Sequence, residues 1–275
     1  MTTKEYIIFT GSNGFIATNL IKNYPFKKSH RYIFVYRNNK PKLNLKNIDY
    51  KLLKIDLRDI SNFKKLPSKG VKMFYHFAAN PDTFISLSKF NNQFYDNTKM
   101  IMNICKYCNK ANVKNLFFSS SVYVYSGSNN KQFYENQETY PQEILGSSKL
   151  SSELILNSWS AHIKTKILIM RFFTIYGPGA NPNQFIPKSI KKIYKAKKNV
   201  YFINNEICRD FIHIDDVINI LNLLTKNLQK IKDKFSIFNV GNGKKIKITF
   251  IIKSLVKLIN PKLNLNLIKS NIQIQ

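Results

Sequence analysis

The chain has 275 residues, of which 44% are hydrophobic and 21% charged. This composition excludes a disordered or collagen-like protein and fits one large domain, or a core domain with a smaller lobe. Lys and Arg number 44 against 15 Asp and Glu, a net charge of +29. We interpret this excess mainly as a solvated lysine-rich surface, with a phosphate-bearing ligand as an alternative and a nucleic-acid partner as a lesser one. No apolar run has the length of a membrane span, and we expect a cytoplasmic protein.

Short apolar runs alternate with longer stretches of helical character along the first two thirds of the chain. The runs are continuous rather than alternating, which is typical of parallel strands buried on both faces. They are Tyr6–Thr10, Tyr32–Tyr36, Met73–Phe77, Leu116–Ser119 and Ile167–Arg171. The helical stretches are Phe15–Tyr24, Asn91–Asn112 and Gly146–His162. This order predicts an α/β protein with a Rossmann-type doubly wound parallel sheet.

The pattern changes after Tyr176. A lysine-rich helical stretch follows at Pro187–Lys198, then two apolar segments and a late strand at Ile237–Val240. We expect residues 1–176 to form a dinucleotide-binding domain, to which the strand near 237–240 returns. Residues 177–275 then form a small C-terminal substrate lobe in discontinuous pieces.

A glycine-rich turn, Gly11-Ser-Asn-Gly14, follows the first strand and opens the first helix. Glycine allows the backbone to approach a pyrophosphate closely, and the amide groups of a helix N-terminus attract its charge. The turn therefore predicts dinucleotide binding by Gly11, Asn13, Gly14, Phe15 and Ile16, although an ordinary strand-to-helix turn has a similar composition.

The end of the second strand bears on the choice of coenzyme. The acidic residue that usually binds the ribose hydroxyls there is replaced by Tyr36, which is followed by Arg37. Because a cation suits a 2′-phosphate, we expect NADP(H) in preference to NAD(H). The alternative is that Arg37 is a solvated residue at the end of a strand.

Eight motifs in order along the chain resemble those of the extended short-chain dehydrogenase/reductases, in the branch of nucleotide-sugar epimerases and dehydratases. They are Thr10–Ala17, Asp56–Asp59, His76–Ala79, Asn97, Ser119–Tyr125, Arg171–Gly179, Arg209–Asp216 and Asn239–Gly243. The resemblance implies hydride transfer between a sugar carbon and a nicotinamide, in the synthesis of a surface polysaccharide.

The resemblance also assigns roles to individual residues. Asp56 and its neighbour Leu57 would hold the adenine, and further coenzyme contacts would come from Phe77, Ala78, Ala79, Asn97, Ser119, Lys149 and Phe172. Ser121 and Lys149 would act in catalysis. Ser121 and Tyr123 would contact the sugar, with Phe185 and Ile186 as a wall beside it, and Arg209 would bind the diphosphate. No residue is assigned to a metal, and Cys105 and Cys108 have no second cysteine or histidine pair nearby.

One position departs from the pattern. The Tyr-x-x-x-Lys motif aligns with Leu145 to Lys149, so leucine stands where the proton-transferring tyrosine is expected. Three interpretations stay open: an enzyme with another proton donor, a coenzyme-binding partner or sensor without activity, or a variant whose substrate needs only a reductase or a non-oxidative step. The candidate donors are Ser121, Tyr123, Tyr125, Tyr140 and a water held by Lys149.

Further expectations concern the remaining motifs. The resemblance implies a homodimer that pairs helices 91–112 and 146–162 through Met100, Ile101, Ile104, Leu150, Leu154 and Ile155. Relatives continue further past the Asn239–Gly243 motif, so we expect a substrate pocket that lacks one wall. We interpret His76 and His213 as structural residues, and we expect Asp215 and Asp216 to cap a helix that begins at Val217.

Overall fold

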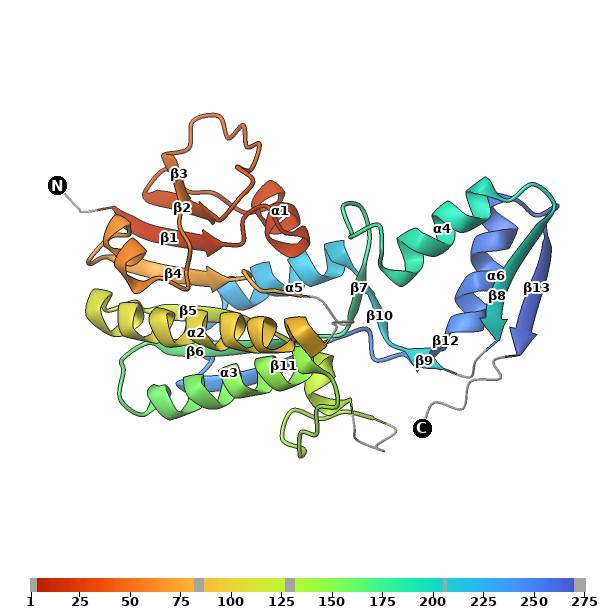
Figure 1. Cartoon of the computed structure of the whole chain (residues 1–275). Helices are drawn as coiled ribbons and strands as arrows, with labels where there is room; N and C mark the ends of the chain where they lie inside the picture. Colours follow the sequence, from red (N-terminus) through yellow and green to blue (C-terminus); the bar gives the residue numbers. More distant parts are fainter. Residues whose placement is uncertain (1–3, 82–86, 127–131, 205–206, 270–275) are drawn as a thin grey trace. The chain divides into compact units, whose positions relative to one another are not determined.

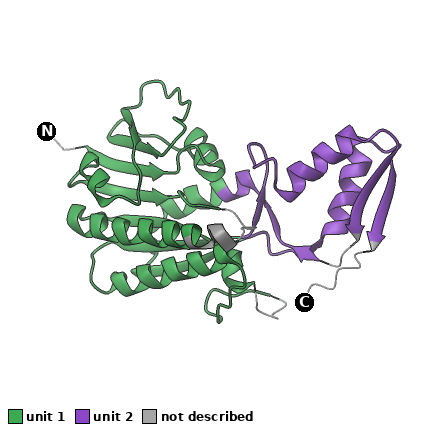
Figure 2. Cartoon of the chain, viewed as in Figure 1, with its two compact units in different colours: residues 1–172, 218–240 green, residues 173–217, 241–275 purple. Residues whose placement is uncertain are grey.

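The computed structural model describes residues 4–81, 87–126, 132–204 and 207–269. The chain divides into two compact units (Figure 2). Unit 1 contains Met1–Phe172 and Ile218–Val240, and unit 2 contains Phe173–Val217 and Gly241–Gln275.

Unit 1 is built on a seven-stranded sheet whose order is β11-β6-β5-β4-β1-β2-β3, with every neighbouring pair parallel (Figure 1). Its strands are β1 (Glu5–Thr10), β2 (His30–Tyr36), β3 (Tyr50–Lys54), β4 (Val71–His76), β5 (Asn115–Ser121), β6 (Lys166–Phe172) and β11 (Phe235–Val240). This topology confirms the predicted doubly wound sheet. The strand that the prediction missed is β3, an edge strand in which Lys51 and Lys54 are exposed and interrupt the apolar run.

Helices cover both faces of this sheet. They are α1 (Phe15–Lys22), α2 (Leu87–Ala111), α3 (Ile144–Ser160) and α5 (Ile214–Lys226), with short 3-10 turns η1 (Ile60–Lys65), η2 (Val122–Tyr125) and η3 (Leu228–Lys230). On one face, Ile101 and Ile104 of α2 are fully buried in a core cluster with sheet residues such as Phe74. On the other face, Phe9 stacks on Tyr75 with ring centroids 4.7 Å apart. Burial of alternate residues on both faces explains why the strands read as continuous apolar runs.

Unit 2 contains α4 (Phe185–Lys195), α6 (Ile248–Ile259) and three two-stranded sheets. The sheets pair β7 (Thr174–Tyr176) with β10 (Phe211–His213), β8 (Asn199–Asn204) with β13 (Asn264–Lys269), and β9 (Cys208–Arg209) with β12 (Ile246–Lys247). Its core joins Ile193, Val200, Val256 and Leu263.

The expected helix start at Val217 is wrong, because α5 begins at Ile214. Asp215 and Asp216 therefore lie inside its first turn, where a carboxylate still opposes the positive end of the helix dipole. His213, the residue before the helix, caps its N-terminus, since the Asp215 backbone N–H donates to His213 Nδ1 at 3.3 Å.

The strand order reverses next to β1. From β1 the chain moves outward to β2 and β3, then crosses to β4 on the other side of β1. In open sheets of this kind, ligands bind outside the carboxyl ends of the strands at such a reversal. The candidate site is therefore expected where β1 and β4 end, at Thr10 and His76.

Candidate functional site

The turn after β1 is shaped by close contact with the end of β4. Gly11 has φ +64°, and a Cβ placed on it would lie 2.7 Å from Ala78 N and 2.9 Å from Phe77 C. Gly14 N–H donates to Gly11 O at 2.8 Å, and α1 begins at the next residue, Phe15. A Cβ on Gly14 would meet Gly11 O at 3.0 Å and nothing else within 4 Å outside the helix itself. The turn thus leads directly into the N-terminus of α1, where the first backbone amides of a helix lack intrahelical partners.

Hydrogen bonds below the turn fix the ends of β1 and β4 together. The Thr10 hydroxyl lies 2.8 Å from His76 Nδ1 and accepts from Ala78 N–H at 3.3 Å. Ser12 Oγ donates to Val35 O at 2.7 Å and links the turn to β2. His76 is buried, and burial together with the nearby charge of Lys149 lowers the pKa of its ring to about 3. The His76 ring is thus neutral and hydrogen-bonded to Thr10.

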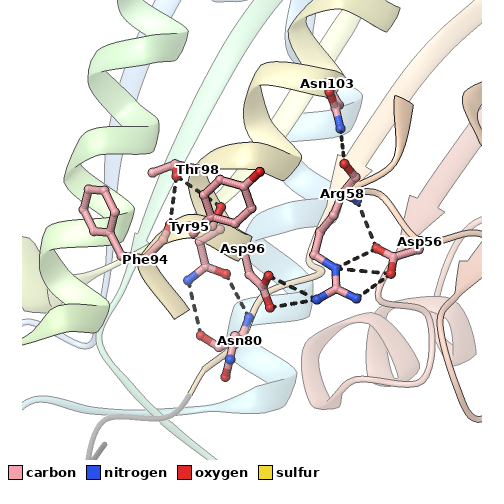
Figure 3. Close-up of polar contacts among 9 residues, drawn as sticks. Asp56, Arg58, Asn80, Phe94, Tyr95, Asp96, Thr98 and Asn103 are labelled. Carbon is pink, nitrogen blue, oxygen red and sulfur yellow. Dashed lines mark hydrogen bonds and ion pairs between the residues drawn. The ribbon is translucent and has the colours of Figure 1, made fainter. Parts of the chain in front are cut away.

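The ends of β2 and β3 form the side of the site assigned to adenine. Arg37 follows β2 and is exposed. Asp56 follows β3, and Arg58 binds its carboxylate through Nε at 2.9 Å and Nη2 at 2.6 Å (Figure 3). The neighbouring Leu57 is buried, and its carbonyl accepts from Asn103 Nδ2 at 3.0 Å. The Arg58 guanidinium lowers the pKa of the Asp56 carboxyl, against the opposing effect of burial.

Asn97 on α2 connects three segments around the end of β4. Its Oδ1 accepts from Asn80 N–H at 2.9 Å, and its Nδ2 donates to Ser148 Oγ at 3.0 Å and to Asn80 O at 3.3 Å. The backbone from Phe77 to Asn80 is thereby held against α2 and α3. Asn97 is buried, and its amide is engaged by these contacts.

Lys149 lies on α3 beside the end of β5. Its Nζ donates to Ser119 O at 2.5 Å and lies 4.9 Å from the centre of the Phe118 ring. Burial lowers the pKa of this ammonium group to about 8, although Glu153 opposes the shift. Ser121 ends β5, and its Oγ accepts from Tyr123 N–H at 3.2 Å, which starts the η2 turn. Leu145 lies one helical turn before Lys149 and is 7% exposed.

A buried ion pair joins α3 to β6 next to the end of β5. Arg171 on β6 binds Glu153 on α3 through Nη2 at 2.6 Å, and both side chains are 4% exposed. The Ser120 hydroxyl donates to Glu153, and Arg171 Nη1 donates to the Tyr125 hydroxyl. Tyr125 also contacts Asn239 Oδ1 at 3.0 Å. The Tyr125 hydroxyl is therefore part of a structural network that joins β5, β6, α3 and β11.

The residues assigned to the sugar nucleotide divide between the units. Ser121 and Tyr123 belong to unit 1, whereas Phe185, Ile186 and Arg209 belong to unit 2. Phe185 and Ile186 open α4, and Arg209 in β9 is exposed. The adjacent Asp210 carboxylate accepts from the backbone N–H groups of Asn242 and Gly243, each at 2.8 Å.

A family model matches residues 7–241 and describes the NAD dependent epimerase/dehydratase family. The chain belongs to this family. An uncharacterized protein of Methanocaldococcus jannaschii, MJ1055, is 28% identical over 93% of this chain and 81% of its own length. The human dTDP-D-glucose 4,6-dehydratase is 27% identical over 92% of this chain and 73% of its own. The structure of MoeE5 in complex with UDP-glucuronic acid and NAD has the same fold, with a TM-score of 0.78 at 23% identity over 96% of this chain and 85% of that one.

Membership of the NAD dependent epimerase/dehydratase family agrees with the sequence resemblance. Two contacts beside the family motifs were not predicted: Asp96 with Arg58, and Asn80 with Asn97. The motifs gave no signal for the first of these contacts, because Asp96 lies 38 residues from Arg58 and outside the motifs.

Other described features bear on membrane and cysteine chemistry. Across the four described ranges, no helix combines the length and apolarity needed to cross a bilayer. Cys105 and Cys108 are buried in the face of α2 that packs on the sheet, and burial raises the pKa of the Cys105 thiol to about 12. Both thiols are therefore held in the protonated, unreactive form.

Proposed function

We propose that the chain is an NAD(P)-dependent enzyme that epimerises, dehydrates or reduces a nucleotide-linked sugar for a surface polysaccharide. The observation that carries this proposal is the close packing of the Gly11–Ile16 turn on the end of β4, within the stretch of chain that the family model matches. The N-terminus of α1, which begins at Phe15 directly after the glycine-rich turn, fits a pyrophosphate, and the acidic Asp56 fits the amino group of an adenine. These residues, with Asn13, Phe15 and Ile16, would hold the coenzyme, which supplies a hydride acceptor.

The chain's own residues would bind and orient the reacting sugar. Lys149 would donate from Nζ to the ribose of the coenzyme, because it is buried beside Ser119 and remains largely charged at neutral pH. Phe77, Ala78, Ala79 and Phe172 end or follow the neighbouring strands and would exclude water from this region. Ser121 would donate its hydroxyl hydrogen bond to the sugar oxygen that gains or loses a proton.

The proton itself needs an acceptor other than residue 145, because leucine carries no titratable group. Of the candidates, the Tyr125 hydroxyl is engaged by Arg171 and Asn239, and Tyr140 is 68% exposed. We therefore retain Ser121, Tyr123 and a water held by Lys149. General acid–base catalysis contributes about 10²–10⁴-fold to such reactions, so a poor substitute would give a slow enzyme rather than an inert one.

A coenzyme-binding protein without activity is the second candidate function. It is favoured by Leu145, which is buried where the family pattern has its tyrosine. Such a protein would keep the coenzyme contacts and act as a partner or sensor.

The two candidates are separated by incubating the purified chain with NAD or NADP and a panel of UDP-, dTDP-, ADP- and GDP-linked sugars. Products are followed by chromatography coupled to mass spectrometry, which detects loss of water, reduction, or an isomer of altered mobility. A new sugar product supports the enzyme. A chain that binds coenzyme and yields no product with any sugar supports the binding protein.

For the coenzyme, we propose NADP(H) in preference to NAD(H). The Arg37 guanidinium makes no hydrogen bond or ion pair with any other residue in the described part of the chain, whereas the charge of Arg58 is balanced by two carboxylates. Arg37 can therefore accept a 2′-phosphate without losing another contact. Arg37→Gln should weaken binding of NADP and leave binding of NAD little changed, as measured by calorimetry.

We also propose a homodimer through α2 and α3. Met100, Ile101 and Ile104, which the sequence suggested for pairing, instead lie in the core of unit 1. Among the described side chains of α2 and α3, the exposed large apolar ones are Tyr95, Met102 and Leu154. Tyr95 and Met102 are two helical turns apart and so lie on one side of α2. Leu154→Asp should shift the sedimentation coefficient from dimer to monomer.

A further inference from the structure

The Asp56–Arg58–Asp96 cluster places one guanidinium between two carboxylates. Arg58 Nη2 lies 2.6 Å from Asp56 Oδ2, and Nη1 lies 3.1 Å from Asp96 Oδ1 (Figure 3). The Asp96 side chain is 15% exposed, and those of Asp56 and Arg58 are about one third exposed. Because the fork of an arginine is planar and rigid, two such contacts fix the plane of the Asp56 carboxylate.

The backbone of the same turn is held independently. Asn103 Nδ2 donates to Leu57 O at 3.0 Å and to Arg58 O at 2.9 Å, and Asn103 is buried. Asn103 lies seven residues after Asp96 and so on the same side of α2, two helical turns further along (Figure 3). This side of α2 therefore contacts the Asp56–Arg58 turn at two points. Asp96 thus acts on the side chain of Arg58, whereas Asn103 acts on the main chain.

As a consequence, the Asp56 carboxylate is a hydrogen-bond acceptor whose orientation is fixed. Beside Arg58, and with Arg37 also nearby, the pKa of Asp56 is lowered, so its carboxylate remains ionised at neutral pH. An ionised carboxylate only accepts hydrogen bonds. It therefore attracts an exocyclic amino group on a purine and repels a carbonyl oxygen at the same place.

We propose that Arg58, held by Asp96, is a positioning residue that gives the coenzyme site its preference for adenine over a 6-oxo purine base. Arg58 acts through Asp56, whose carboxylate it orients toward the amino edge of the base. This inference rests on the proposed coenzyme function and adds to it a determinant of base specificity outside the glycine-rich turn.

The test compares each coenzyme with its hypoxanthine analogue, in which a carbonyl oxygen replaces the amino group. Dissociation constants of NAD, NADP and the two analogues are measured by calorimetry for the wild type and for Arg58→Gln, Arg58→Lys and Asp96→Asn. Arg31→Gln is the matched control, because it removes an arginine that binds Asp49 at 2.8 Å elsewhere on unit 1. Asn103→Ala reports a purely structural change of the same turn.

The wild type and Arg31→Gln should prefer the adenine coenzyme by roughly 10–100-fold, the range of a hydrogen bond to a charged group. In Arg58→Gln this preference should fall below about threefold, with intermediate values in Arg58→Lys and Asp96→Asn. Asn103→Ala should weaken both coenzymes equally and keep the ratio. Folding of each variant is checked by circular dichroism, and Asp96→Asn carries the test if Arg58→Gln does not fold.

Failure has distinct forms. A wild type that binds no coenzyme overturns the proposed function and this inference together. A wild type that binds adenine and hypoxanthine coenzymes equally overturns the contact of Asp56 with the amino group. If the wild type prefers adenine and this preference is unchanged or increased in Arg58→Gln and Asp96→Asn, the role of Arg58 is overturned while the proposed function stands.

Discussion

Replacing Gly11 by alanine tests the turn between β1 and α1 in quantitative terms. The new methyl group would lie 2.7 Å from Ala78 N and 2.8 Å from Ala78 Cα, which are backbone atoms of the next strand end and cannot rotate away. The residue also has φ +64°, which costs a non-glycine residue about 1–2 kcal/mol. Overpacking adds about 1–3 kcal/mol. We therefore expect Gly11→Ala to lower the free energy of unfolding by about 2–5 kcal/mol.

Gly70→Ala separates the two costs. Gly70 belongs to the same unit and has φ +74°, but a Cβ on it would meet only Tyr6 Cδ2, at an ordinary 3.8 Å. This control should lose about 1–2 kcal/mol from backbone strain alone. Both variants are measured by urea unfolding and by calorimetric titration with coenzyme, and Gly11→Ala alone should lose affinity, because the strand end at Phe77–Ala79 must move. Equal loss of stability in the two variants, with unchanged coenzyme affinity, would refute the reasoning.

Three further predictions concern α3 and its partner strand. Leu145→Tyr should raise the rate of product formation by about 10²–10⁴-fold if the rest of the site is competent. Asn157→Tyr, at an exposed position of α3 that has no assigned role, should not, and equal rates in both variants would contradict the assignment of residue 145. Because burial lowers the pKa of Lys149 from 10.5 to about 8, Lys149→Met should have the larger free energy of unfolding at pH 7, and the wild type should become more stable relative to it as the pH rises from 8 to 10.5, where only the unfolded chain still binds the proton. A difference in the free energy of unfolding between the two proteins that stays constant across this range would exclude the shift. Arg171→Met should cost about 3–5 kcal/mol in urea unfolding by leaving Glu153 buried and unpaired, and adding Glu153→Leu should restore much of it; a loss under 1 kcal/mol would show that the pair is not buried in solution.

The parallel sheet was predictable because burial on both faces leaves a simple trace in the sequence. Strands such as β1 and β5 are continuous apolar runs, and the prediction placed them within two residues of their observed bounds. Edge strands lack this trace. Lys51 and Lys54 are exposed on β3, and within the described residues β8 and β13 are paired with each other in a two-stranded sheet, so these strands lack long apolar runs.

The part of the candidate site that could be predicted consists of residues that follow the ends of strands. Gly11 directly follows β1, and Asp56 and Ala78 come two residues after the ends of β3 and β4, and the topology brings these ends to one edge of the sheet. The contact of Arg58 with Asp96 could not be predicted, because it depends on the rotation of α2 about its own axis. The same rotation places Met100 in the core rather than at a surface for a second copy.

Isothermal titration calorimetry of the purified chain with NAD and with NADP tests most directly whether the Gly11–Ile16 turn holds a coenzyme. We expect saturable heat with one site per chain, tighter binding of NADP than of NAD, and weaker binding of both to Gly11→Ala. The absence of heat with either coenzyme at saturating concentration, from a chain that is folded by circular dichroism, would contradict the proposed site.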